Sequence, residues 1–155
     1  MSDSRRPRRI EVIARGLVVR ENRVLACRNL EHGHLFLPGG HVEPGEPASA
    51  ALARECDEEC GEPIRVGPLL LVAESLFEQQ GRPRHEVNLV FHVEHAAGVW
   101  PERVTSREAH IGFAWLEPAM AQAELLPRVI GAWAADRCSG NRAQTPTAGW
   151  ISDAS

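Results

Sequence analysis

The sequence contains no lysine and no tyrosine, and each absence excludes a kind of chemistry. All 17 basic residues are arginine, so no lysine amine is present to act as a nucleophile or to form a Schiff base. Without tyrosine, no phenol ring is available as a stacking platform for a nucleobase. The formal net charge is −4, which makes extended nucleic acid, held by its phosphates, a poor partner.

Long apolar runs and paired cysteines are also missing. No apolar stretch approaches the length that spans a bilayer, and residues 1–12 have no apolar region followed by a cleavage site. The four cysteines, Cys27, Cys56, Cys60 and Cys138, form no CxxC pair, so we expect buried free thiols. We therefore expect a cytoplasmic protein that has no membrane partner.

The stretch GHVEPGEPASAALARECDEECGE, residues 40–62, predicts a helix at about 47–60. Pro47 suits the first helical position, where its missing N–H costs nothing, and Gly61 suits a left-handed turn that ends the helix. At about 100° per residue, Glu55, Glu58 and Glu59 project from one face of this helix.

These three acids repel one another, and they lie at the end of the helix where its dipole disfavours negative charge. Each of these effects costs on the order of 0.3–1 kcal/mol. A divalent cation that prefers oxygen ligands, such as Mg²⁺, would remove both penalties. The alternative interpretation is a solvated acidic face, which is the usual role of a charge run.

The spacing of the stretch favours the cation. Gly40 is followed by Glu46, by Arg54-Glu55, by Glu58-Glu59 and by Gly61, which resembles the Nudix box of the Nudix hydrolase family at seven specified positions. A chance match at a given start has a probability on the order of 10⁻⁷ or less. The family's closing apolar position is Glu62 here, and Cys56 fills its internal apolar position.

The resemblance implies a fold, a reaction and a set of site residues. It implies an α/β/α sandwich with a mixed β-sheet over residues 9–138, and cleavage of a diphosphate linkage in a small nucleotide with Mg²⁺ or Mn²⁺. By position, the metal ligands are Gly40 through its carbonyl, Glu55, Glu58 and Glu59, and Glu55 is alternatively the base. Arg54 is expected to orient the glutamates and to pair with Glu46. The catalytic residues implied are therefore Glu55, Arg54 and Glu58.

Some assignments stay open at this level. Family members often add a carboxylate from outside the box, for which Glu86 is the first candidate and Glu74 the second. No pattern indicates which residues bind the rest of the substrate. A Nudix-like module that binds or senses a nucleotide without turnover is the alternative function, and a non-catalytic acidic helix that binds a partner is a third.

The rest of the chain alternates strand and helix patterns. Strands are expected at residues 10–20, 23–28, 35–37, 64–78, 85–95 and 111–116, and helices after 117 and over 125–138. Residues 1–8 are expected to be a flexible basic arm. Residues 139–155 are expected to be a polar tail, disordered or wrapped on a partner subunit in a homodimer, with Trp150 as its exposed anchor.

Overall fold

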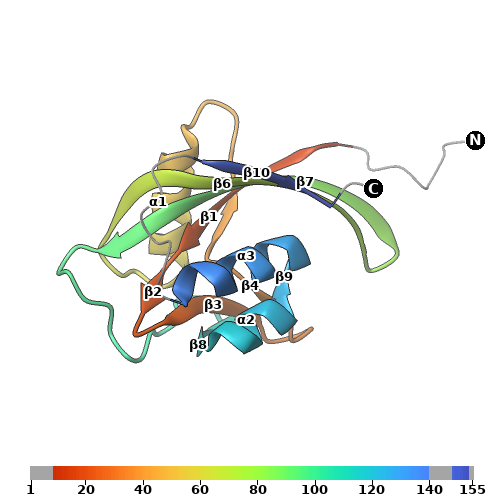
Figure 1. The fold of residues 1–155 in the computed structure, drawn as a ribbon. Helices are drawn as coiled ribbons and strands as arrows, with labels where there is room; N and C mark the ends of the chain where they lie inside the picture. Colours follow the sequence, from red (N-terminus) through yellow and green to blue (C-terminus); the bar gives the residue numbers. More distant parts are fainter. Residues whose placement is uncertain (1–8, 140–147, 154–155) are drawn as a thin grey trace, which may run out of the picture.

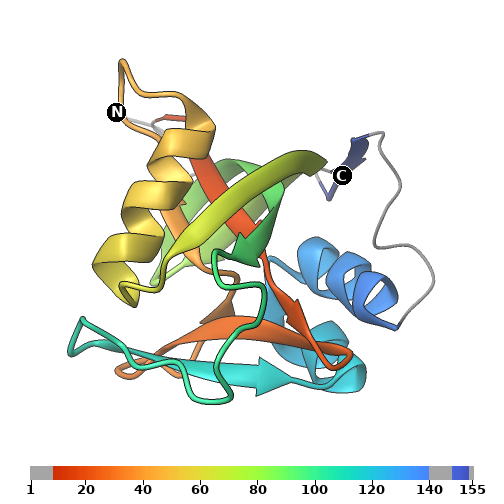
Figure 2. The ribbon, with the colours of Figure 1, turned by 90° about the vertical axis from the view of Figure 1, so that its left-hand side faces the viewer.

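The computed structural model describes residues 9–139 and 148–153, and the arm predicted at residues 1–8 lies outside them. The predicted α/β class is confirmed, with the strands divided between two five-stranded sheets rather than gathered in one. Each sheet is mixed, because it contains both parallel and antiparallel pairs. Figure 1 and Figure 2 show the two sheets one above the other, with the helices packed around them.

The first sheet has the strand order β10-β6-β7-β1-β5. Its strands are β1 (Glu11–Leu17), β5 (Gly39–His41), β6 (Ile64–Gln79), β7 (Arg82–His95) and β10 (Gly149–Ser152). The β6–β7 hairpin is the longest element, and its register shifts between Val66 and Leu71. Pro68 lies within this irregularity, where a missing N–H is tolerated.

The second sheet has the order β2-β3-β4-β9, and β8 also pairs with β3. Its strands are β2 (Val19–Arg20), β3 (Arg23–Asn29), β4 (Leu35–Phe36), β8 (Ile111–Leu116) and β9 (Leu125–Leu126). A turn at Glu21 and Asn22 joins β2 to β3, and both residues have positive φ, at 49° and 58°. This geometry matches the twist of the two flanking strands.

Helix α1 (Ala48–Glu59) covers one face of the first sheet, close to the predicted bounds (Figure 2). It buries Ala51, Leu52 and Cys56 against that sheet. A Cβ added at Gly16 of β1 would lie 3.6 Å from Cδ1 of Leu52 and 3.0 Å from Cγ2 of Val93. Glycine at position 16 therefore allows α1 to pack closely on the sheet.

Helices α2 (Pro118–Glu124) and α3 (Arg128–Cys138) pack in an apolar cluster that is separate from the one under α1. This cluster includes buried residues of both sheets. The prediction of one helix over 125–138 is wrong at its start. Leu125 and Leu126 form β9 beside β4, and Pro127 precedes α3. Proline restricts the residue before it to extended backbone, so the helix begins only after it. No helix in the described ranges is long and apolar enough to cross a membrane.

Part of the predicted polar tail is a strand. β10 pairs in parallel with β6, placing Trp150 beside Val72, and residues 140–147 and 154–155 lie outside the described ranges. Asp153 fixes the end of β10, because its carboxylate accepts hydrogen bonds from Ser75 Oγ at 2.8 Å and from the Leu76 N–H at 3.0 Å. No pattern in residues 149–152 predicts this pairing, because the four-residue strand depends on β6 for its hydrogen bonds.

Replacing Asp153 by alanine should lower the free energy of unfolding by about 1 kcal/mol, because two hydrogen bonds to a charged but largely exposed group are lost. Urea denaturation measures this change. Asp136→Ala is the matched control, since Asp136 is an exposed acid on α3. Equal effects of the two substitutions would show that β10 does not contribute to stability.

Candidate active site

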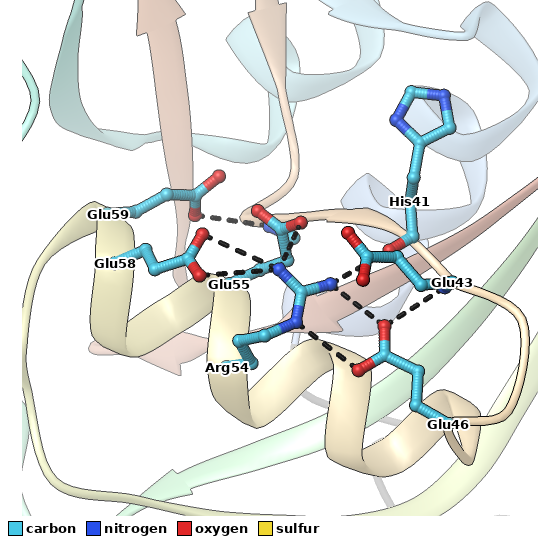
Figure 3. Close-up of polar contacts among 8 residues, drawn as sticks. His41, Glu43, Glu46, Arg54, Glu55, Glu58 and Glu59 are labelled. Carbon is cyan, nitrogen blue, oxygen red and sulfur yellow. Dashed lines mark hydrogen bonds and ion pairs between the residues drawn. The ribbon is translucent and has the colours of Figure 1, made fainter.

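The three acids of α1 share one face, as predicted, but differ in exposure (Figure 3). The side chain of Glu58 is 51% exposed and that of Glu55 19%, whereas Glu59 is only 5% exposed. Asp57 lies off this face and pairs with Arg107 at 3.5 Å. The helix ends after Glu59, and Gly61 takes a φ of 66°, which suits glycine.

Arg54 joins the acidic face to the loop that precedes α1. Its guanidinium donates to both carboxylate oxygens of Glu46, at 2.8 and 3.2 Å, and to Glu55 at 3.0 Å. It also donates to Glu58 at 3.4 Å and to the carbonyl of His41 at 3.1 Å (Figure 3). These contacts lower the pKa of Glu46 and raise that of Arg54, so both remain charged. One cation therefore offsets the repulsion among the acids and closes the loop.

Two glycines of β5 bring the backbone against the acidic face. A Cβ on Gly40 would lie 2.3 Å from the carboxyl carbon of Glu55, so only glycine leaves room for that carboxylate. Gly39 has a φ of 135°, and a Cβ there would lie 1.9 Å from the carbonyl oxygen of Ala14. Both positions require glycine, the first for contact with Glu55 and the second for backbone geometry.

Glu59 is a buried carboxylate with few partners. It accepts a hydrogen bond from the Gly39 N–H at 3.2 Å, and the thiol of Cys27 lies 3.8 Å from the same oxygen. Burial raises the pKa of Glu59 to about 8, although Arg15 and the Gly39 N–H act in the opposite direction. Bringing a positive charge to this carboxylate would therefore stabilise its ionised form.

Glu108 is an acid near the site that sequence reasoning missed. It precedes β8, and its charge contributes to the raised pKa of Glu59. The N–H of Arg107 donates to the carbonyl of Glu59 at 2.7 Å, which holds this segment against the end of α1. No local pattern marks Glu108, because its position depends on contact between segments almost fifty residues apart in the sequence.

The two extra acids suggested by the sequence have other contacts. Glu86 is buried on the sheet face opposite α1, where the side-chain amide of Asn88 donates to it at 3.3 Å. Glu74 accepts from Ser152 and pairs with His85 at 2.9 Å, and the hydrogen bond from His85 lowers its pKa. In the described part of the chain, neither acid has a hydrogen bond or an ion pair with a residue of α1.

The donor set of α1 fits a hard divalent cation. It consists of carboxylate oxygens together with the nearby Gly40 backbone, which are the ligands that Mg²⁺ and Mn²⁺ prefer. Across residues 9–139 and 148–153, no three histidine, cysteine or acidic side chains already converge as a closed ligand cage.

Comparison with known proteins agrees with this geometry. The family model described as NUDIX domain matches residues 8–134. A "MutT-like protein" of Streptomyces ambofaciens is 36% identical over 104 residues, which are 66% of this chain and 61% of the length of that relative.

Solved structures share the fold. A NUDIX hydrolase from Nitrosomonas europaea has a TM-score of 0.67 at 19% identity. The match covers 92% of this chain and 79% of the chain of that hydrolase. A MutT protein from Methanosarcina mazei Go1 has a TM-score of 0.64 at 23% identity, covering 85% and 96%. A MutT NUDIX hydrolase from Burkholderia pseudomallei has a TM-score of 0.59 at 25% identity, covering 72% and 85%.

The pKa of Glu59 predicts a pH effect on the metal-free protein. Because the pKa of Glu59 in the folded protein, about 8, lies above the ordinary carboxyl value of 4.5, the folded state holds this proton more tightly. Glu59 therefore reduces stability as pH rises from about 5 to about 9. Glu59→Gln should remove this loss, so the free energy of unfolding of the variant minus that of the parent should increase with pH.

Urea denaturation in chelator at several pH values measures this difference. Asp57→Asn is the matched control, since it removes an exposed carboxylate from the same helix. A difference for Glu59→Gln that does not increase with pH, or one no larger than that of the control, would show that Glu59 is not destabilised by burial.

The two glycines should respond differently to alanine. Gly39→Ala should lower the free energy of unfolding by more than about 3 kcal/mol, because it forces backbone strain and a clash with Ala14. Gly40→Ala should cost less, because the clashing atoms belong to the Glu55 side chain, but it should weaken Mn²⁺ binding by displacing that carboxylate. Urea denaturation and calorimetric Mn²⁺ titration test both effects. Normal Mn²⁺ affinity in Gly40→Ala would contradict the placement of Glu55.

Proposed function

Because the chain belongs to the Nudix family of hydrolases, we propose that it cleaves a diphosphate linkage with Mg²⁺ or Mn²⁺. The substrate is a nucleoside diphosphate joined to another group, and water attacks at phosphorus. The observation that carries this proposal is the acidic face of α1, on which Glu55, Glu58 and Glu59 lie together (Figure 3), with Gly40 against the Glu55 carboxylate. The chain spans 61% of the length of the MutT-like relative that it matches.

The residues of the face have distinct tasks in this reaction. The carboxylates of Glu55, Glu58 and Glu59, with the Gly40 carbonyl, would hold the cation, which neutralises phosphate oxygens and acidifies water when bound. Glu55 is alternatively the base that takes the proton from the attacking water. Arg54 orients Glu55 and Glu58 and, through Glu46, keeps the loop before α1 closed.

We propose Glu108 as the carboxylate from outside the box, in preference to Glu86 and Glu74. Its charge acts on Glu59, and its segment is bonded to the end of α1. Glu86 and Glu74 are engaged with other partners on the first sheet. Glu108 also pairs with His110 at 3.1 Å, and it is preferred because its segment, unlike those of Glu86 and Glu74, is hydrogen-bonded to the end of α1.

Binding of a nucleotide without turnover is the second candidate function. Loss of a glutamate from the acidic face would favour it, but all the catalytic positions are present in this chain. We further propose a small-molecule nucleotide substrate, a cytoplasmic location and a homodimer. The exposed Trp150, at 61%, is the feature that supports an interface between subunits.

A screen of diphosphate compounds tests the proposed reaction. Nucleoside triphosphates, dinucleoside polyphosphates, nucleotide sugars and RNA 5′ ends would each be incubated with Mg²⁺ or Mn²⁺, and release of phosphate and nucleoside monophosphate would be measured. Activity should disappear in chelator and return with metal. Hydrolysis that persists undiminished in excess chelator would rule out the metal assignment.

With an identified substrate, Glu58→Gln should lower kcat/KM more than about a hundredfold, equivalent to at least ~3 kcal/mol of transition-state stabilisation. The metal-free protein should keep its stability or gain slightly, because one like-charge repulsion on α1 is removed. Asp57→Asn is the matched control, since Asp57 lies off the acidic face. Equal loss of activity in both variants would show that the face does not carry the reaction.

A further inference from the structure

A row of polar side chains lies on the face of the first sheet opposite α1, and the proposed reaction does not use it. Arg15 of β1, Asn88 of β7 and Glu86 of β7 occupy this face. Asn88 is fully buried and Glu86 is 7% exposed. Polar groups are costly to bury unless they are hydrogen-bonded, and these three are bonded to one another in sequence.

Arg15 is held at several points. Its Nε donates to Oδ1 of Asn88 at 3.4 Å, and its Nη1 donates to the carbonyl of Leu37 at 3.1 Å. The guanidinium also lies over the ring of Phe36, 5.4 Å from its centroid. Asn88 in turn donates to Glu86, so both ends of its amide are used and its orientation is fixed. The position of the guanidinium is therefore set before any ligand binds.

The charge of Arg15 is not neutralised by a direct ion pair within the described residues. Its hydrogen-bond acceptors, the Leu37 carbonyl and the Asn88 amide, are both neutral. Its Nη2 makes no hydrogen bond among the described residues, and it is not among the buried polar atoms that lack a partner. Nη2 is therefore not fully buried, and Arg15 as a whole is only partly buried.

Arg15 is also close to the acidic face. It binds the carbonyl of Leu37, and Glu59 binds the N–H of Gly39, so both side chains hold the same short turn. Arg15 pairs with Gly39 across β1 and β5, and its charge lowers the pKa of Glu59. The free donors of Arg15 therefore lie at the border of the site that would receive the diphosphate.

We propose that Arg15 contacts the substrate directly and donates through Nη2 to an oxygen of its diphosphate group. This inference rests on the proposed function. A diphosphate entering the site meets three carboxylates on α1, and Arg54 is already engaged with Glu46, Glu55 and Glu58. Arg15 supplies the missing positive charge, and Asn88 is the residue that positions it.

The test compares ligand binding with metal binding in the full chain. The ligand probe is methylenediphosphonate, a diphosphate that water cannot cleave, titrated by calorimetry at saturating Mg²⁺. Arg15→Met keeps the side-chain stem and removes the charge, and it should weaken binding of the probe about tenfold or more. Binding of Mn²⁺ alone should change less than about twofold, since Arg15 is not a metal ligand. Arg15→Lys should bind the probe with intermediate affinity, because it keeps the charge but loses the planar fork.

Arg82→Met is the matched control. It removes one exposed arginine at the tip of the β6–β7 hairpin and should leave binding of the probe unchanged. The result that overturns the inference is a probe affinity in Arg15→Met equal to that of the parent, or an equal loss of Mn²⁺ affinity, which would indicate a purely structural role. Arg28 is an exposed arginine of β3. Loss of probe binding in Arg28→Met without loss in Arg15→Met would also overturn the inference, because a different arginine would then contact the diphosphate.

The failure of this inference can be separated from failure of the proposed function. If the parent protein neither binds Mn²⁺ nor hydrolyses any diphosphate compound, the proposed function fails and the inference fails with it. If the parent does both and Arg15→Met binds the probe like the parent, only the role of Arg15 is wrong.

Discussion

The electrostatic contact between Arg54 and the glutamates around it is the interaction on which the site depends. Three acids on one helical face repel one another, and Arg54 offsets that repulsion for Glu55 and Glu58 while binding Glu46 in the preceding loop. The same guanidinium bonds the carbonyl of His41 at the end of β5. Helix, loop and strand are thus held together by one charged group, which fixes Gly40 against Glu55.

Among the residues that the structure describes, one acid of this face, Glu59, has no ion pair with a cationic side chain. Glu59 is buried, its carboxylate accepts an N–H from Gly39, and its pKa is raised to about 8. The repulsion is therefore only partly relieved within the chain, and a divalent cation would relieve the remainder while completing its shell with water and phosphate oxygens. Arg15, with neutral hydrogen-bond partners of its own, adds a second positive charge at the border of the same site.

Residue spacing predicted the central part of the molecule well, because the features concerned are local. The bounds of α1, the common face of Glu55, Glu58 and Glu59 and the Arg54–Glu46 pair all follow from helical geometry and a contiguous motif. Features set by contacts between distant segments were missed. Glu108 reaches the site through bonds between the 106–107 segment and the end of α1, and β10 exists only by pairing with β6. Neither leaves a signal in its own residues. The partners of Glu86 and Glu74 are likewise set by tertiary contacts, and a role for these acids in the site stays a prediction.

Anomalous diffraction from crystals soaked in Mn²⁺ tests the central claim most directly, because it locates the cation without requiring a known substrate. A metal-binding face on α1 predicts a peak within about 2.5 Å of carboxylate oxygens from at least two of Glu55, Glu58 and Glu59. The exposed carboxylate of Glu58 should turn from Arg54 toward the metal in that structure. A peak at Glu86 or Glu74 with none on α1, or no peak at saturating Mn²⁺, would contradict the claim.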